Sequence, residues 1–308
     1  MDLSQRIIRT SIDWSGNGLT LIDFLSGRFT YRSKEEWITR INSGEITLNN
    51  KIVPPETLLV LHDCVEYRPE DIEEPPADLD YRIVFEDEFL LVIDKPGNLC
   101  MHPAGPFFKH TLWHLLCSKY GTVHFVNRLD RETSGLLLAV KEPKLAKQLA
   151  KSVSFKRYLA VVHGEFPEEL LADGFLVDAN SVVRKKRKFV SQMPDNPPFE
   201  SAKTAFVRQK YINGMSLVEA TLFTGRMHQI RATLFSLGFP VAGDKLYGPD
   251  ERFYLKQSSG ELSAEDRKKL LISRQALHSA ELEFIHPQSK EKLVFNSPLP
   301  AELQSLLK

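Results

Sequence analysis

The sequence has few cysteines, no long hydrophobic run and no net charge, and each absence excludes a class of protein. Its 308 residues include three cysteines without CxxC spacing, which argues against a disulfide framework and a thiolate zinc site. The longest apolar runs, residues 89–93 and 136–140, are far too short to cross a bilayer. The first ten residues lack the apolar core of a secretory signal. We therefore expect a cytoplasmic protein without a membrane partner.

The 40 basic and 40 acidic residues cancel in number but are unevenly distributed. Residues 184–188 form an unbroken cationic run, whereas residues 70–80 carry most of an acidic, proline-containing stretch. Short basic runs are often only solvated loops. The alternative is a phosphate-binding surface, and the run alone does not decide between the two.

Segment 68–80 divides the chain. It is charged, contains three prolines and shows no apolar period, so it is predicted to be a linker between a domain at 1–67 and a domain at 81–308. In the first domain, apolar residues fall on one helical face at 21–25 and on another at 37–41. Ser33 is the expected N-cap of the second helix, with Glu36 as its capping-box partner. The pattern predicts two helices followed by a small hairpin.

The second domain is rich in predicted strands. Residues 83–85 and 89–93 form a predicted hairpin, and 135–140, 158–163, 217–223, 280–284 and 293–295 are further strands. One predicted helix follows Pro143, and another spans 228–237 and ends before Gly238. This mixture predicts an α+β domain with flanking helices around a largely antiparallel sheet.

The most informative stretch is 125–138, in which a polar cluster precedes a strand that must be buried. Asp130 is therefore expected at the edge of the sheet, where Gly135 lets the backbone pass closely. The commonest role of such an Asp is to accept hydrogen bonds from backbone donors in its own turn. In the alternative, Arg128 and Arg131 keep the carboxylate ionised for use as a nucleophile or an electrostatic partner.

The stretch RLDRETSGLLL at 128–138 resembles the signature of the RluA-type pseudouridine synthases. Four further motifs of that family follow the same order, at 86–103, 156–164, 224–248 and 275–300. The first domain resembles an S4-type RNA-binding module in residues 24–25, 41–49 and 62–63. Its helical part carries the basic residues Arg28, Arg32, Lys34 and Arg40. A helical cap that binds no RNA remains the alternative for this domain.

The resemblance implies that the protein isomerises uridines of structured RNA, either ribosomal RNA or transfer RNA, without a cofactor or metal. Asp130 would be the catalytic carboxylate, either attacking the sugar or assisting departure of the base through a glycal-like intermediate. Tyr158 would stack on the base and is a candidate acceptor of the C5 proton, and Arg231 would pair with Asp130. Arg128 would fill the gap left by the flipped base. The predicted substrate-binding residues are Arg128, Thr133, Lys185, Arg187, Arg226 and Ile230.

One departure from the family and two rival functions follow from the same residues. Asn127 stands where the family most often has His, so altered support of the catalytic loop is expected. A protein that binds RNA without modifying it is the first rival. A metal-dependent hydrolase is the second, because His110 and His114 are spaced for one helix face, although no Glu follows His110 as in HExxH. A monomer without an obligatory protein partner is expected.

Overall fold

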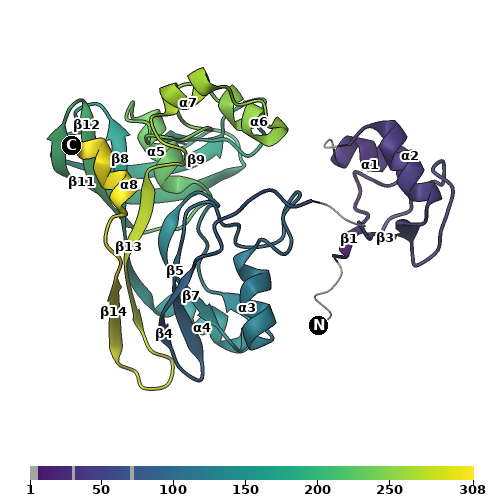
Figure 1. Ribbon diagram of the computed structural model, residues 1–308, viewed down its shortest axis with the longest axis horizontal. Helices are drawn as coiled ribbons and strands as arrows, with labels where there is room; N and C mark the ends of the chain where they lie inside the picture. Colours follow the sequence, from purple (N-terminus) through teal and green to yellow (C-terminus); the bar gives the residue numbers. More distant parts are fainter. Residues whose placement is uncertain (1–5, 30–31, 70–72) are drawn as a thin grey trace. The chain divides into compact units, whose positions relative to one another are not determined.

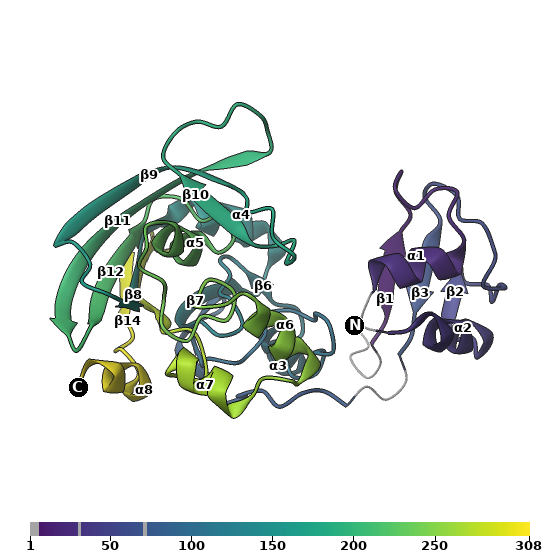
Figure 2. The same cartoon turned by 90° about the horizontal axis from the view of Figure 1, so that it is seen from above.

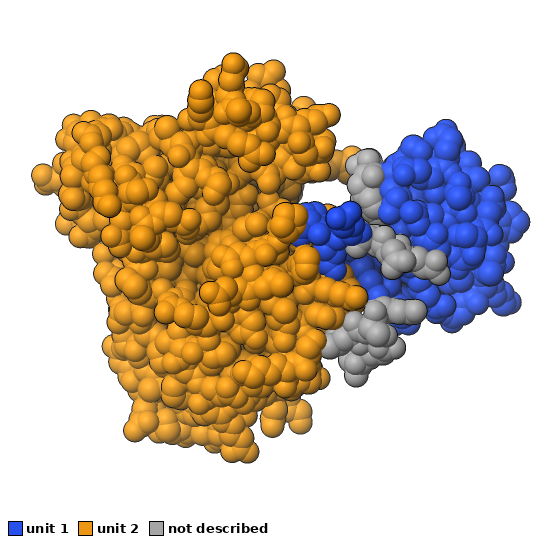
Figure 3. Space-filling model, in the orientation of Figure 1, with its two compact units in different colours: residues 1–75 blue, residues 76–308 orange. Residues whose placement is uncertain are grey.

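The computed structural model describes residues 6–29, 32–69 and 73–308. Two compact units, Met1–Pro75 and Pro76–Lys308, divide the chain (Figure 3). The division falls inside the segment 68–80 that is predicted to be a linker. Residues 70–72 of that segment lie outside the described residues.

The first unit is a three-stranded antiparallel sheet with two helices, in the strand order β1-β3-β2. Its elements are β1 (Ile8–Ser11), α1 (Leu21–Arg28), α2 (Lys34–Asn42), β2 (Ile46–Leu48) and β3 (Cys64–Tyr67). The capping box of Ser33 and Glu36 at the start of α2 is confirmed. Strand β1 is an addition that the sequence did not indicate, and residues 59–61, ahead of β3, form no strand of the sheet.

The core of the first unit contains the apolar faces expected of its two helices. Trp37 is fully buried and meets the ring of Tyr67 edge-on, with 5.3 Å between ring centroids. Leu21, Leu25 and Ile41 are buried around them. The helix periods read from the sequence therefore identified the inward faces correctly.

The second unit is built on one mixed sheet of eleven strands. The main path runs β10-β9-β11-β12-β8-β13-β7-β5-β4, while β14 pairs with β13 and β6 pairs with β7. The β13–β7 pairing is parallel, whereas the other pairings are antiparallel. The strands are β4 (Arg82–Glu86), β5 (Leu90–Lys95), β6 (His124–Phe125), β7 (Ser134–Val140), β8 (Val153–His163), β9 (Glu169–Asp178), β10 (Arg187–Val190), β11 (Phe199–Ile212), β12 (Met215–Leu222), β13 (Leu277–Ile285) and β14 (Lys292–Asn296). This architecture confirms the α+β class.

Helices flank the sheet (Figure 1). They are α3 (Leu112–Tyr120), α4 (Pro143–Ser152), α5 (Gln229–Ser236), α6 (Arg252–Ser259), α7 (Ala264–Leu270) and α8 (Ala301–Gln304), followed by a 3-10 turn at Ser305–Leu307. Helix α4 contributes Leu149 to a core with Leu136 and Leu282. In Figure 2, β9, β11 and β12 run side by side as a curved layer with α5 inside the curve, where α5 contacts β9 and β10. No helix among the described residues is long and apolar enough to span a membrane.

The polar cluster precedes the start of β7, where the backbones of β7 and β13 approach each other closely. Gly135 pairs with Ser279 where β7 and β13 run parallel. Its φ is +106°, and a Cβ atom placed on it would lie 2.2 Å from the carbonyl oxygen of Ser279. Only glycine meets both conditions. The crossing places the start of β7, and the loop that carries Asp130, beside β13 and β8.

Candidate active site

Asp130 lies in the loop between β6 and β7, with 31% of its side chain exposed. Its backbone carbonyl closes the turn by accepting the N–H of Thr133 at 3.1 Å. Its carboxylate faces other side chains instead. Oδ2 accepts Nη1 of Arg231 at 2.6 Å and Nε2 of Gln275 at 3.5 Å. The simpler interpretation, in which this carboxylate serves its own turn, therefore does not describe the structure.

The carboxyl group of Asp130 is strongly biased towards its ionised form. Burial by itself would raise its pKa, but the charge and hydrogen bond of Arg231 outweigh burial and lower the pKa to about 2. His228, which is charged only at low pH because its pKa is lowered to about 4, acts in the same direction. The expectation that Arg128 and Arg131 supply this effect is wrong. Arg131 is paired with Glu132 at 3.2 Å, and the stabilising cation comes from a helix 101 residues away in sequence.

Arg231, on α5, is itself fixed by a buried acid. Its Nε and Nη2 donate to the two carboxylate oxygens of Asp244, at 2.6 Å and 2.9 Å. Asp244 is fully buried and also accepts the backbone N–H groups of Leu246 and Tyr247. This two-pronged pair fixes the plane of the guanidinium and leaves Nη1 directed at Asp130. Asp244 lies within the motif at 224–248, which gives no indication of its role.

Gln275 supports the loop that carries Asp130 from the segment just before β13. Its amide nitrogen donates to the hydroxyl of Thr133 as well as to Asp130. Thr133 is only 2% exposed, and its hydroxyl is engaged by Gln275. The prediction that Thr133 binds substrate is therefore corrected: it is a buried support of the loop.

Lys95 holds the same loop through its backbone. Its fully buried ammonium group donates to the carbonyl oxygens of Pro96, Leu99 and Arg131, at 2.7, 3.0 and 3.0 Å. Burial and the nearby charge of Arg274 lower the pKa of Lys95 to about 7. Asn127 ties the loop to β7 by accepting the N–H of Leu138 at 2.8 Å. Both ends of the loop that carries Asp130 are thus anchored to neighbouring strands.

Tyr158 lies on β8, opposite Ser279 of β13, and is 6% exposed. Burial raises its pKa to about 12, while the hydroxyl of Ser279 acts the other way and Asp130 adds to the rise. A phenol with so high a pKa is a poor proton acceptor near neutral pH. Ile230 is buried at the start of α5, one residue before Arg231. The sheet thus brings a carboxylate, an arginine and an aromatic ring together from three separate elements.

The remaining predicted RNA contacts lie further out. Arg128 is exposed, and no salt bridge to it is found among the described residues. Arg226 is also exposed, but its side chain donates to the carbonyl of Ser201 at 3.1 Å and lies 3.8 Å from Glu200. Arg226 is therefore tied to β11, whereas Arg128 is available to a ligand.

The cationic run lies on the turn between β9 and β10 and enters β10 at Arg187. Lys186 is paired with Glu251 at 2.7 Å and Arg187 with Asp178. Lys185 is exposed and lies 4.3 Å from the ring centroid of Tyr254. A cavity of about 310 Å³ opens beside the run, lined by Ala179, Ser181, Lys186, Arg187, Lys188, Phe235, Ser236 and Glu251. The run is thus partly neutralised, with Arg184, Lys185 and Lys188 left exposed.

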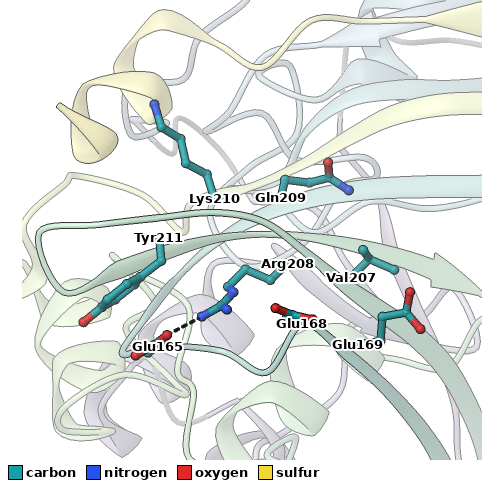
Figure 4. A pocket seen from close by; sticks show the side chains of 8 residues that line it. All are labelled: Glu165, Glu168, Glu169, Val207, Arg208, Gln209, Lys210 and Tyr211. Carbon is teal, nitrogen blue, oxygen red and sulfur yellow. Dashed lines mark hydrogen bonds and ion pairs between the residues drawn. The ribbon is translucent and has the colours of Figure 1, made fainter.

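A cavity of about 440 Å³ elsewhere on the molecule contains none of the predicted site residues (Figure 4). It is lined by Glu165, Glu168, Glu169, Val207, Arg208, Gln209, Lys210 and Tyr211. Arg208 is engaged by Glu165 at 2.8 Å. The three glutamates make this an unfavourable surface for a polyanion.

The metal-hydrolase alternative finds no support in the geometry of its two histidines. Helix α3 begins at Leu112 with Thr111 as its N-cap, so His110 precedes the helix. The expectation that both histidines share one helix face is therefore wrong. In the described part of the chain, no cluster of three or more His, Cys, Asp or Glu side chains could hold a metal ion.

Comparison with solved structures defines the fold. A human protein, RNA pseudouridylate synthase domain containing 1, matches with a TM-score of 0.55 and 22% sequence identity, over 75% of this chain and 85% of that chain. The architecture is therefore the pseudouridylate synthase fold. Residues 89–236, which include Asp130, Tyr158 and Arg231, match the family model described as RNA pseudouridylate synthase.

Curated relatives define the family more closely. The ribosomal large subunit pseudouridine synthase D of Zymomonas mobilis is 35% identical over 256 residues, 78% of this chain and 76% of the relative. The mitochondrial tRNA pseudouridine(32) synthase of Saccharomyces cerevisiae is 34% identical over 237 residues, 75% of this chain but only 51% of the relative. The chain belongs to the RNA pseudouridine synthases of the RluA type, which are isomerases.

Proposed function

We propose that this protein converts chosen uridines of ribosomal RNA or transfer RNA to pseudouridine, with Asp130 as the catalytic carboxylate. The observation that carries the proposal is the state of that side chain. It is ionised by Arg231 yet still 31% exposed, so it can reach a substrate. The names of the relatives, which include synthases for both kinds of RNA, support the two substrate classes.

The reaction requires little beyond a well-placed carboxylate. The N1–C1′ bond breaks, the uracil turns, C5 bonds to C1′, and the C5 proton leaves while N1 gains one, so atoms and electrons balance. Asp130 either attacks C1′ or takes part in departure of the base through a glycal-like intermediate. Both routes need the anion, which the low pKa of Asp130 supplies across the neutral range.

The target nucleotide must leave its helix to reach Asp130. Arg128, which is exposed and two residues from Asp130 in sequence, would fill the gap with its planar head group. Tyr158 would stack on the extruded base, with Ile230 beside it. We assign Tyr158 to stacking, because its pKa of about 12 disfavours a role as base for the C5 proton.

Basic residues outside the immediate surroundings of Asp130 would bind the RNA backbone. Lys185 would contact phosphate, with Arg187 and Arg226 contributing only if RNA displaces their present partners. The N-terminal unit would add contacts as an S4-like module. Action as a monomer in the cytoplasm, without cofactor, metal or obligatory protein partner, completes the proposal.

Two measurements test the proposal. The protein should release tritium from transcripts of ribosomal or transfer RNA carrying 5-tritiated uridine, and absence of release from both would contradict it. Mapping pseudouridines in RNA from cells with and without the protein should then show specific positions that are lost. Losses confined to one kind of RNA would decide between the two substrates.

A further inference from the structure

His228 stands between Asp130 and a buried tyrosine, in a backbone conformation that few non-glycine residues adopt. It precedes α5 with φ 57° and ψ 19°, in the left-handed region. Its side chain is 10% exposed, and Nε2 lies 3.8 Å from Oδ1 of Asp130. Nδ1 lies 3.0 Å from the hydroxyl oxygen of Tyr247. An unfavourable backbone held at an active site is a reason to look for a role.

Hydrogen bonds around Tyr247 favour one assignment of the proton on the ring of His228. The hydroxyl oxygen of Tyr247 accepts the backbone N–H of Arg187 at 2.9 Å. Its own O–H is then free to donate, and Nδ1 of His228 is the acceptor within reach. An accepting Nδ1 leaves the hydrogen on Nε2. The Nε2–H group therefore faces the catalytic carboxylate.

The imidazole is neutral at ordinary pH. Burial lowers the pKa of His228 to about 4, with help from the charges of Arg231 and Lys185 and against the opposing effects of Asp130 and Asp244. His228 is therefore a neutral donor and not a second counter-ion, so Asp130 keeps the charge that the reaction needs.

The two oxygens of Asp130 are consequently unlike. Oδ2 is committed to Arg231 and Gln275. Among the described residues, Oδ1 has only His228 nearby, at a distance too long for a hydrogen bond. Contacts of this kind in a ligand-free site shorten when substrate closes it. Oδ1 is thus the oxygen left for the nucleoside.

We propose that His228 is a positioning residue for the isomerisation, held by Tyr247 so that its Nε2–H orients Asp130 with Oδ1 towards the substrate. The inference rests on the proposed role of Asp130. No proton passes to or from His228 in this role. Its effect is to restrict rotation of the carboxylate about the Cβ–Cγ bond of Asp130, which the hydrogen bond from Arg231 alone would leave free.

Two substitutions at His228 separate this role from a purely structural one. His228→Gln keeps an N–H donor close to the place of Nε2, whereas His228→Asn places its amide near Nδ1. Asn tolerates the left-handed backbone better than Gln, so a structural role would favour Asn. We expect the opposite order in kcat: Gln close to wild type and Asn lower by about 10- to 100-fold, as for other supporting partners. The KM for RNA should be unchanged in both. Equal or better activity of the Asn variant would overturn the proposal.

A third variant and a spectrum complete the test. Tyr247→Phe keeps the ring beside Arg231 but removes the hydroxyl, and should lower kcat by about tenfold without changing KM. Nitrogen NMR of the imidazole in the full-length protein should show hydrogen on Nε2, and hydrogen on Nδ1 would overturn the assignment. The spectrum needs no activity. It therefore still tests His228 if the wild type released no tritium, the result that would sink the proposed function.

Discussion

The charged side chains around Asp130 and those on the helices of the N-terminal unit are of the same types but lie in opposite environments. Arg231 is 8% exposed and shares two buried or half-buried carboxylates. Lys34 and Asp23 form a pair in which each side chain is more than half exposed. Buried charges are costly to separate from their partners, whereas exposed pairs exchange readily with water and salt. The charged groups around Asp130 are therefore held in fixed positions, whereas those on the N-terminal helices form at most an adaptable contact surface.

The largest effect is expected at the carboxylate itself. Asp130→Asn keeps the shape and removes the charge, so isomerisation should fall by about 10³-fold or more. Binding of RNA, measured by filter retention, should stay within about twofold. Tritium release at a normal rate would contradict the assignment of Asp130.

Arg231→Gln tests what keeps Asp130 ionised. At present the pKa of Asp130 is lowered to about 2, so its ionised form contributes stability above its usual pKa of 3.8, and this contribution is lost as the pH falls towards 2. Without Arg231, burial dominates and raises the pKa. The acid limb of kcat should then move to higher pH, and kcat should fall by about 10²-fold. An acid limb at the same pH as in the wild type would show that a group other than Arg231 keeps Asp130 ionised.

Asp244→Asn compares a buried pair with an exposed one directly. Removal of one partner of a buried pair should cost about 3 kcal/mol in the free energy of unfolding, measured with urea, and should lower kcat. Asp250→Asn is the matched control, since Asp250 forms a two-pronged pair with Arg252 whose side chain is 76% exposed. This control should unfold and react like the wild type. Equal losses in both variants would remove the distinction between the two environments.

The cationic run should show an intermediate effect. Each phosphate contact that is lost should reduce the slope of log K against log salt by about one. Neutralising Lys185, Lys186 and Arg187 together should lower the slope by less than three, because Lys186 and Arg187 already have acidic partners. Lys185→Ala alone should account for most of the change. An unchanged slope in the triple variant would mean that the run faces away from RNA.

The smallest effects belong to the N-terminal unit. Arg28 lies over the rings of Phe24 and Phe29, and no salt bridge to it is found in the described residues, whereas Lys34 is paired with Asp23. Arg28→Ala should weaken binding by about two- to fivefold at low salt, and Lys34→Ala by less. If neither variant changes affinity, the unit is a cap that binds no RNA.

The sequence predicted the elements whose apolar residues are periodic or whose ends carry clear signals. The hairpin of β4 and β5, the strand β7 and the helix cap at Ser33 are confirmed. Strands β9, β10 and β11 were missed. Burial alternates along β9 and β11, but their buried positions include the small or polar residues Ala172, Gly174, Ala202 and Thr204, so no apolar alternation marks them. The curved edge of the sheet is defined by pairing and not by local propensity.

The site was partly predictable for a similar reason. Asp130, Tyr158 and Arg231 were named through motifs, and the structure brings them together from a loop, a strand and a helix. What supports them was not predictable, because Asp244 and Gln275 act through contacts spanning 13 and 145 residues. Thr133 was assigned to the substrate because a sequence does not reveal which side of a loop is buried. For the same reason, Arg128 and Arg131 were expected to be the cations that keep Asp130 ionised.

The position of β13 within the sheet has a consequence for biosynthesis. This strand joins β8 on one side to β7 on the other, yet it follows both by more than a hundred residues. A nascent chain that ends before Leu277 would contain two separate sheet fragments, each with an unpaired edge strand that is prone to aggregation. It would also lack the pairing of Ser279 with Gly135. Isomerase activity should therefore switch on abruptly as ribosomes release this segment, without a gradual rise during translation.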